Sequence, residues 1–153
     1  MKMYIPEIGD KIVLSEDWTF RLFDEGRNSS LFTLLNVKAR GAHFIKGGKK
    51  FYGGAFNHVW GWHSDDGERL IVENYFDYAR GITKNGITLV EDQGTPVTLK
   101  AGQVLSVDRV YIRRGAKDYS SVTFNYIGAP KGSGRIRFWA KLDDVNNIIF
   151  EKD

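Results

Sequence analysis

The chain has no cysteine and only three histidines and three prolines among its 153 residues. The absence of cysteine excludes disulfides, thiolate zinc sites and a cysteine nucleophile. No stretch approaches the roughly 20 apolar residues that a membrane-spanning helix needs, and Met1–Glu7 lacks the apolar run of a secretion signal. We therefore expect a protein that works in the cytoplasm and has no membrane partner.

Motifs of catalysis are also scarce. The sequence has no Gly-x-Ser-x-Gly elbow and no His-Glu-x-x-His zinc motif. The basic loops Lys46–Lys50 and Lys131–Arg135 lack the spacing of a phosphate-binding P-loop. One alternative is a metal site formed by His58, His63, Asp65, Asp66 and Glu68. Its two histidines, however, would point to opposite faces of a strand. We expect no enzyme, no cofactor and no metal, with a metal-dependent hydrolase as the outside alternative.

Short stretches of alternating apolar and polar residues dominate the chain. Residues 17–22, 121–126 and 135–142 alternate in this way, which is typical of half-buried strands. Glycine-rich turns separate them, and Asn85-Gly86 suits a type I′ hairpin turn. We predict an all-β fold, a small SH3-like or related barrel or sandwich, with at most one short helix near Asp143–Asn147.

The same pattern predicts one β-rich domain covering residues 1–153, because no linker or low-complexity tract interrupts it. Residues 97–107 suggest a strand, a tight turn and a second strand, as at the opening of an SH3-like barrel. Two small barrels packed together remain the alternative.

Charge is unevenly distributed along the chain. There are 22 lysines and arginines against 19 aspartates and glutamates, a net charge of +3. Residues 38–50 and 93–141 are basic, and residues 65–92 are acidic. Basic zones of this kind attract anionic partners, although a modest net charge also simply keeps a protein soluble.

The last alternating segment combines these features. Its inner face is apolar, and its other face carries Arg135, Arg137, Trp139 and Lys141. If residues 119–127 and 135–142 form a hairpin, Asn125 lies opposite Arg137, Thr123 opposite Trp139 and Ser121 opposite Lys141. Guanidinium groups suit phosphate, and a flat indole suits a nucleobase. The alternative is an ordinary solvated sheet face with arginine stacked on tryptophan.

Further residues extend this candidate site. Arg109 and Arg113 belong to the same basic zone, and Tyr119 offers a second aromatic ring. The complete predicted ligand-binding set is Arg109, Arg113, Tyr119, Ser121, Thr123, Asn125, Arg135, Arg137, Trp139 and Lys141.

A second aromatic segment carries no lysine, arginine, aspartate or glutamate. On one continuous strand of residues 51–64, Phe56, His58, Trp60 and Trp62 would share a face. Such a face is either part of the core of a small barrel or a stacking surface for a ligand. The sequence leaves both interpretations open.

Three segments of the C-terminal half, Val107–Gly115, Tyr119–Phe124 and Arg137–Asn146, resemble segments of small uncharacterised bacteriophage proteins. This resemblance implies an accessory phage protein in the host cytoplasm, which would bind a host protein, a nucleic acid or a nucleotide signal. It implies no particular activity.

These observations predict a non-catalytic protein that binds a phosphate-bearing ligand. The ligand would be single-stranded nucleic acid or a nucleotide signal, and in a phage context the protein would sequester a host nucleotide signal. The alternative is a protein-interaction module whose exposed aromatic residues and arginines contact a host protein or a second copy of the chain, giving a homo-oligomer.

Overall fold

The computed structural model describes residues 6–112 and 120–152. In this part of the chain the strands pair antiparallel and form three sheets, which confirms the all-β fold class. The finer prediction of an SH3-like barrel or sandwich stays a prediction. The sequence predicted one domain, with two small barrels as the alternative. The structure groups the residues into two compact units, each with its own buried cluster: unit 1 is residues 1–39 with 95–153, and unit 2 is residues 40–94.

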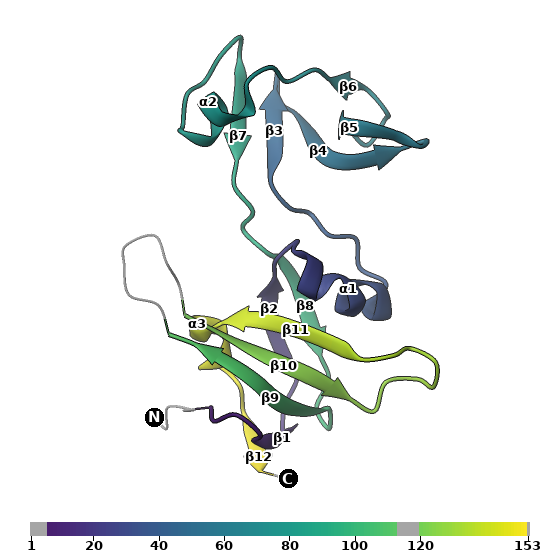
Figure 1. The fold of residues 1–153 in the computed structure, drawn as a ribbon, viewed down its shortest axis with the longest axis vertical. Coiled ribbons are helices and arrows are strands. Elements are labelled where there is room, and N and C mark those ends of the chain that lie inside the picture. Colours follow the sequence, from purple (N-terminus) through teal and green to yellow (C-terminus); the bar gives the residue numbers. More distant parts are fainter. Residues whose placement is uncertain (1–5, 113–119, 153) are drawn as a thin grey trace. The chain divides into compact units, whose positions relative to one another are not determined.

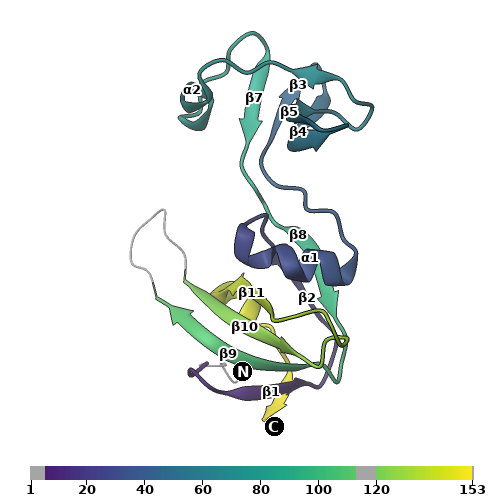
Figure 2. The same ribbon diagram turned by 45° about the vertical axis from the view of Figure 1, so that its right-hand side comes forward.

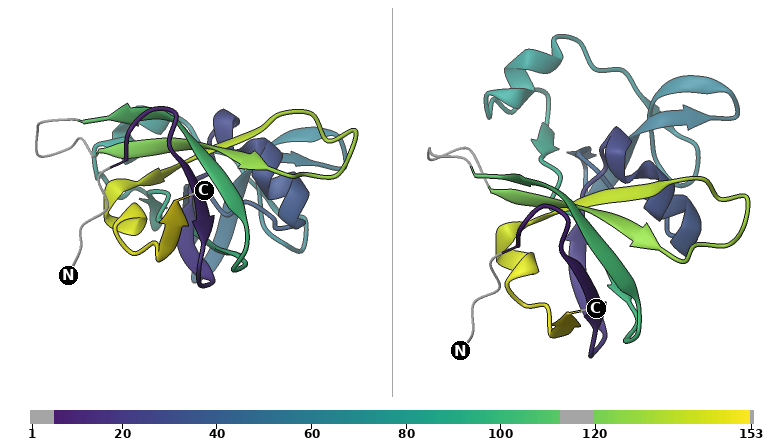
Figure 3. Two further views of the ribbon diagram at one scale, coloured as in Figure 1. Left: turned by 90° about the horizontal axis from the view of Figure 1, so that it is seen from below. Right: turned by 60° about the horizontal axis from the view of Figure 1, so that its bottom comes forward.

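Unit 1 contains a five-stranded sheet, ordered β11-β10-β9-β1-β12, and a two-stranded ribbon, β2-β8 (Figure 1). The strands are β1 Lys11–Leu14, β2 Trp18–Leu22, β8 Thr95–Leu99, β9 Val104–Tyr111, β10 Ser121–Ile127, β11 Ile136–Lys141 and β12 Phe150–Lys152. β12 pairs with β1 at one edge of the sheet (Figure 3). A turn at Lys100–Gly102 joins β8 to β9, which confirms the strand-turn-strand prediction for residues 97–107.

Aromatic rings fill the core of unit 1. Ile136, Phe138 and Ala140 alternate along β11 and are all buried, as the sequence predicted. Phe138 stacks at 5.5 Å from Phe124, and Trp18 stacks at 4.0 Å from Phe20. Burying one such side chain contributes about 1.5–3 kcal/mol, so this face of the sheet anchors the unit.

The β10–β11 hairpin has the register that the sequence predicted. Ser121 pairs with Lys141, Thr123 with Trp139, and Asn125 with Arg137. On the other side of β10, the register to β9 shifts between Thr123 and Phe124. A bulge of this kind places an extra residue in one strand and redirects its side chain.

Three short helices accompany the strands in the described residues. α3, Leu142–Val145, confirms the helix predicted near Asp143–Asn147. α1, Ser29–Leu35, follows a 3-10 turn, η1, Gly26–Asn28, and packs on β11 (Figure 2). α2, Tyr75–Ala79, belongs to unit 2. All three helices have seven residues or fewer, which is too short to leave a readable period of 3.6 residues, and the sequence analysis did not predict α1 or α2. No helix in the described ranges is long and apolar enough for a membrane span.

Unit 2 is a second five-stranded sheet, ordered β6-β5-β4-β3-β7. Its strands are β3 His43–Lys46, β4 Lys49–Phe56, β5 Val59–His63, β6 Arg69–Leu70 and β7 Ile87–Val90. A small cluster of buried side chains holds it together: Phe44, Phe51, Leu70, Tyr78 and Ile87.

A tight turn divides the aromatic segment of unit 2. Asn57 and His58 have φ angles of 48° and 66° and join β4 to β5. Phe56 therefore pairs with Val59, and Trp60 pairs with Ala55. The prediction that Phe56, His58, Trp60 and Trp62 share one strand face is wrong, because the chain reverses at positions 57 and 58. The hairpin turn that the sequence predicted at Asn85 and Gly86 is confirmed, with φ angles of 53° and 74°.

The turn between β4 and β5 leads to a prediction about stability. His58 adopts a left-handed conformation, which costs a residue with a Cβ atom about 1–2 kcal/mol. His58→Gly removes that cost but gives the unfolded chain more freedom, so we expect a net gain of about 0.5–1 kcal/mol. Urea unfolding followed by tryptophan fluorescence measures it. His58→Ala, which keeps a Cβ atom, serves as the control, and an equal gain in that variant would contradict the backbone explanation.

Candidate functional site

The polar face of strands β9, β10 and β11 carries most of the predicted ligand-binding residues. The strand pairing forms three rows across this face: Ser106–Asn125–Arg137, Arg109–Thr123–Trp139 and Tyr111–Ser121–Lys141. Asp108, at the bulge, and Arg135, just before β11, complete the surface that we call the basic face. Arg113 and Tyr119 lie outside the described residues.

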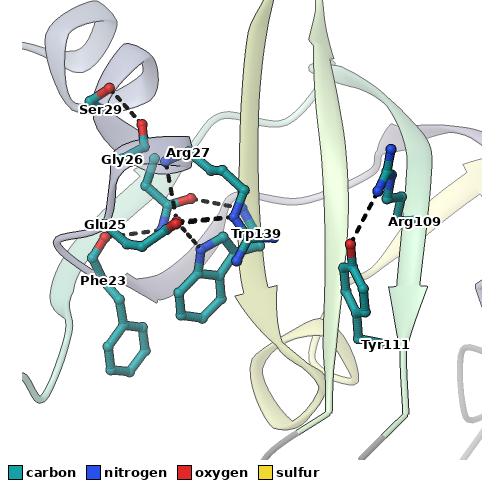
Figure 4. A network of polar contacts seen from close by, with 9 residues as sticks. Phe23, Glu25, Gly26, Arg27, Ser29, Arg109, Tyr111 and Trp139 are labelled. Carbon is teal, nitrogen blue, oxygen red and sulfur yellow. Dashed lines mark hydrogen bonds and ion pairs between the residues drawn. The ribbon is translucent and has the colours of Figure 1, made fainter.

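Trp139 differs from the prediction in one decisive respect: its indole is covered. It is only 4% exposed, and Phe23 stacks on it with ring centroids 5.4 Å apart. Its Nε1–H donates a hydrogen bond of 2.7 Å to Oε2 of Glu25 (Figure 4). The prediction that this indole is displayed for a ligand is therefore wrong. It holds part of unit 1 together instead.

The cover comes from the segment that enters α1. Asn28 is fully buried, and its Oδ1 accepts a hydrogen bond of 2.8 Å from the backbone N–H of Trp139. Its Nδ2 donates a bond of 2.9 Å to the carbonyl of Phe23. Glu25 caps η1 by accepting a bond from the N–H of Arg27. Sequence reasoning missed Glu25 and Asn28 because no local pattern links them to β11.

The pKa of Glu25 reflects these contacts. Burial raises the pKa of this carboxyl, but hydrogen bonds from Trp139 and Arg27 and the positive charge of Arg27 outweigh that effect. The net result is a lowered pKa, so the carboxylate that accepts the indole N–H is ionised at neutral pH.

The predicted hydroxyl donors are also covered. Thr123 is 2% exposed, and Ser121 is buried beside it. Oγ1 of Thr123 has no hydrogen-bond partner within residues 6–112 and 120–152. Neither hydroxyl is accessible to a ligand on this face. A ligand bound here would therefore contact the charged side chains around them.

Arg135 and Asn125 meet at one end of the basic face. Nε of Arg135 donates to Oδ1 of Asn125 at 3.0 Å, and Nη2 forms an ion pair of 3.0 Å with the half-buried Asp108. Arg135, Asn125 and Ser106 line an open groove of about 390 Å³. The bulge in β9 brings Asp108 to this place, and it orients the guanidinium of Arg135 without covering it.

Three further cations belong to this face: Arg109, Arg137 and Lys141. The exposed Arg109 donates to the hydroxyl of Tyr111 at 3.4 Å, and this contact together with nearby negative charge raises its pKa (Figure 4). Lys141 lies with Nζ 4.6 Å from the ring centre of Phe23. Arg137 makes no ion pair with any described residue. Asp108 is the only acidic residue within β9, β10 and β11, and Glu25 adds a second carboxylate beside Trp139.

In the other basic zone, residues 38–50, acidic side chains form ion pairs with two of the five cations. Arg40 pairs with Asp65 at 3.0 Å. Lys49 contacts Asp66 at 2.9 Å and Glu68 at 2.6 Å. Hydrogen bonds from Ser64 and Lys49 lower the pKa of Asp66 to about 2. The acidic stretch that follows residues 38–50 in sequence therefore supplies their ion-pair partners.

The proposed metal group of histidines and carboxylates is dispersed. His58 lies in the β4–β5 turn, and His63 stacks on Phe56 at 5.7 Å. Among the described residues, no three histidine or carboxylate side chains gather closely enough to hold a metal ion. The three acids of the group are the ones that pair with Arg40 and Lys49.

No family model, no curated protein and no solved structure matches the chain.

Proposed function

We propose that the protein binds single-stranded nucleic acid through the basic face, without catalysing a reaction on it. The observation that carries the proposal is the position of Arg109, Arg135 and Arg137 on or beside one face of three adjacent strands, where Asp108 is the only acidic residue that the strands themselves contribute. Phosphates along a strand release counterions when such side chains neutralise them, which makes an open cationic sheet face suitable for a polymer.

A polymer fits this face better than a small nucleotide. The indole that would have stacked on a nucleotide base is engaged with Phe23 and Glu25. The cations are spread over several rows of the sheet, and the groove at Arg135 is open. An extended chain of phosphates can contact several of these positions at once. In the setting that the phage resemblance implies, the polymer would be met in the host cytoplasm.

Replacing two of these cations together tests the proposal. Because Arg109 and Arg137 come from different strands, we expect Arg109→Ala/Arg137→Ala to weaken binding of a thymidine oligonucleotide about 10- to 100-fold at about 50 mM salt. Each phosphate contact on a single strand contributes about −0.7 to the slope of log K against log salt, so losing two contacts should make that slope less negative by about 1.4. Fluorescence anisotropy between about 50 mM and about 200 mM salt measures both quantities.

The matched control is Lys50→Ala, which removes an exposed cation from unit 2. It should leave affinity and salt slope almost unchanged. If the control lost about half as much affinity as the double variant, on a logarithmic scale, binding would follow net charge alone, because the control removes one cation and the double variant removes two. A saturable thermal shift with mononucleotides, together with no oligonucleotide binding, would replace the polymer with a nucleotide signal.

A further inference from the structure

The hairpin turn that precedes β7 carries an asparagine followed by a glycine, the only such pair in the chain. Asn85 and Gly86 are both exposed, and backbone hydrogen bonds between Lys84 and Ile87 close the turn. Asparagine is a thermally labile residue, because its side-chain amide can react with the backbone nitrogen that follows it. A glycine in the following position has no side chain to obstruct that approach. The pair is therefore a candidate site of covalent modification.

Both reacting groups of this turn are free within the part of the chain that the structure describes. The side-chain amide of Asn85 makes no hydrogen bond there, and neither does the backbone N–H of Gly86. Apart from the two chain neighbours of Gly86, nothing lies within 4 Å of the position that a Cβ atom on this residue would occupy. The amide can therefore rotate toward the backbone nitrogen without losing a contact.

A second turn of unit 2 has a similar sequence but engaged groups. Asp66 also precedes a glycine, Gly67. The carboxylate of Asp66 accepts hydrogen bonds from Ser64 and Lys49, and the N–H of Gly67 donates a bond of 3.0 Å to the carbonyl of Ser64. The group that would be attacked and the group that would attack are both occupied. A reaction in this turn would first have to break these contacts, which distinguishes it from the turn at Asn85.

Burial protects another asparagine that precedes a small residue. Asn28 is followed by Ser29, but its side chain is fully buried in unit 1. Its amide donates to the carbonyl of Phe23 and accepts from the backbone N–H of Trp139. A reaction at Asn28 therefore requires unfolding of this part of the core, whereas Asn85 needs only a local movement of an exposed turn.

We propose that Asn85 is a site of spontaneous deamidation. The backbone nitrogen of Gly86 attacks Cγ of Asn85, and the new C–N bond closes a succinimide ring. The attacking nitrogen gives up its proton, and the C–N bond of the side-chain amide breaks to release ammonia. Water then opens the ring at one of its two carbonyl carbons. One opening gives aspartate, and the other gives isoaspartate, in which the main chain continues through the former side-chain carbonyl.

Either product changes unit 2 without the action of an enzyme. Both add a negative charge at position 85, and isoaspartate also adds an atom to the main chain of the turn. The length of a hairpin turn fixes the register of the strands beside it, so isoaspartate alters the connection that leads into β7. This inference does not depend on nucleic-acid binding.

Incubation of the full chain in native buffer and in guanidinium chloride, followed by peptide mapping in a mass spectrometer, tests the proposal. The peptide with Asn85 should gain about one dalton. Its native rate should lie within about 10-fold of the denatured rate, because exposed turns open locally at little cost. For Asn28 the native rate should be lower than the denatured rate by roughly 1,000-fold or more, since reaction there requires unfolding. Fragment spectra should show isoaspartate beside aspartate.

Two variants define the site. Asn85→Gln should abolish the mass gain, because the longer side chain would have to close a larger ring. Asn57→Gln is the matched control, since Asn57 is another exposed asparagine with a left-handed φ of 48°, and it should leave the gain at Asn85 unchanged.

Three results would overturn the proposal. Conversion of Asn85 in guanidinium chloride but not in native buffer would show that the ordered turn protects it. A product that contains aspartate without isoaspartate would exclude the succinimide ring. An equal native mass gain at Asn57, which precedes histidine, would show that exposure alone decides and that the pair with glycine has no special role.

Discussion

Trp139→Ala is expected to lower the free energy of unfolding of unit 1 by about 3–5 kcal/mol, the range for truncating a large buried aromatic residue. The indole is buried between the sheet and Phe23, and it donates a hydrogen bond to Glu25. Truncation leaves a cavity and removes the contact that holds residues 23–28 against β11. Urea unfolding monitored by circular dichroism measures the loss.

A milder variant separates the structural role of Trp139 from a role in binding. Trp139→Phe keeps most of the packing but removes the N–H that Glu25 accepts, so the pKa of Glu25 should rise toward its ordinary value. Carboxyl chemical shifts followed against pH report that change. Affinity for the thymidine oligonucleotide should stay at the wild-type level. Loss of binding in a folded Trp139→Phe protein would instead show that the indole contacts the ligand.

The covered indole shows which features of this sheet the sequence could predict and which it could not. Strict alternation identified β11, and the turn at residues 128–134 set the register of the hairpin, because both signals are local. The cover on the second face comes from residues 23–28, more than 100 positions away in sequence. The alternation of apolar and polar residues predicts that one face of a strand is polar. It does not predict whether a segment distant in sequence packs on that face.

Unit 2 illustrates the same limit at shorter range. Asn57 and His58 form a turn although neither is glycine, so the aromatic segment resembled one continuous strand. The basic stretch 38–50 resembled a binding zone, but Asp65, Asp66 and Glu68 pair with two of its cations. Zones of opposite charge that follow each other in sequence can neutralise each other once hairpins bring them together.

Asn28→Ala is expected to lower the free energy of unfolding by about 2–4 kcal/mol, although Asn28 is not one of the predicted ligand-binding residues. Its side chain satisfies two buried backbone groups, the N–H of Trp139 and the carbonyl of Phe23. Removing the amide leaves both without a partner, at about 1–3 kcal/mol each, with some relief where water enters. Urea unfolding gives the size of the effect.

Asn147→Ala is the matched control, because Asn147 is exposed and should contribute less than about 0.5 kcal/mol. Since Asn28 and Trp139 hold the same segment, the loss in the double variant Asn28→Ala/Trp139→Ala should be smaller than the sum of the two single losses. Strictly additive losses would mean that residues 23–28 stay in place without either contact. The cover on β11 would then have another cause, such as the packing of α1 in the core.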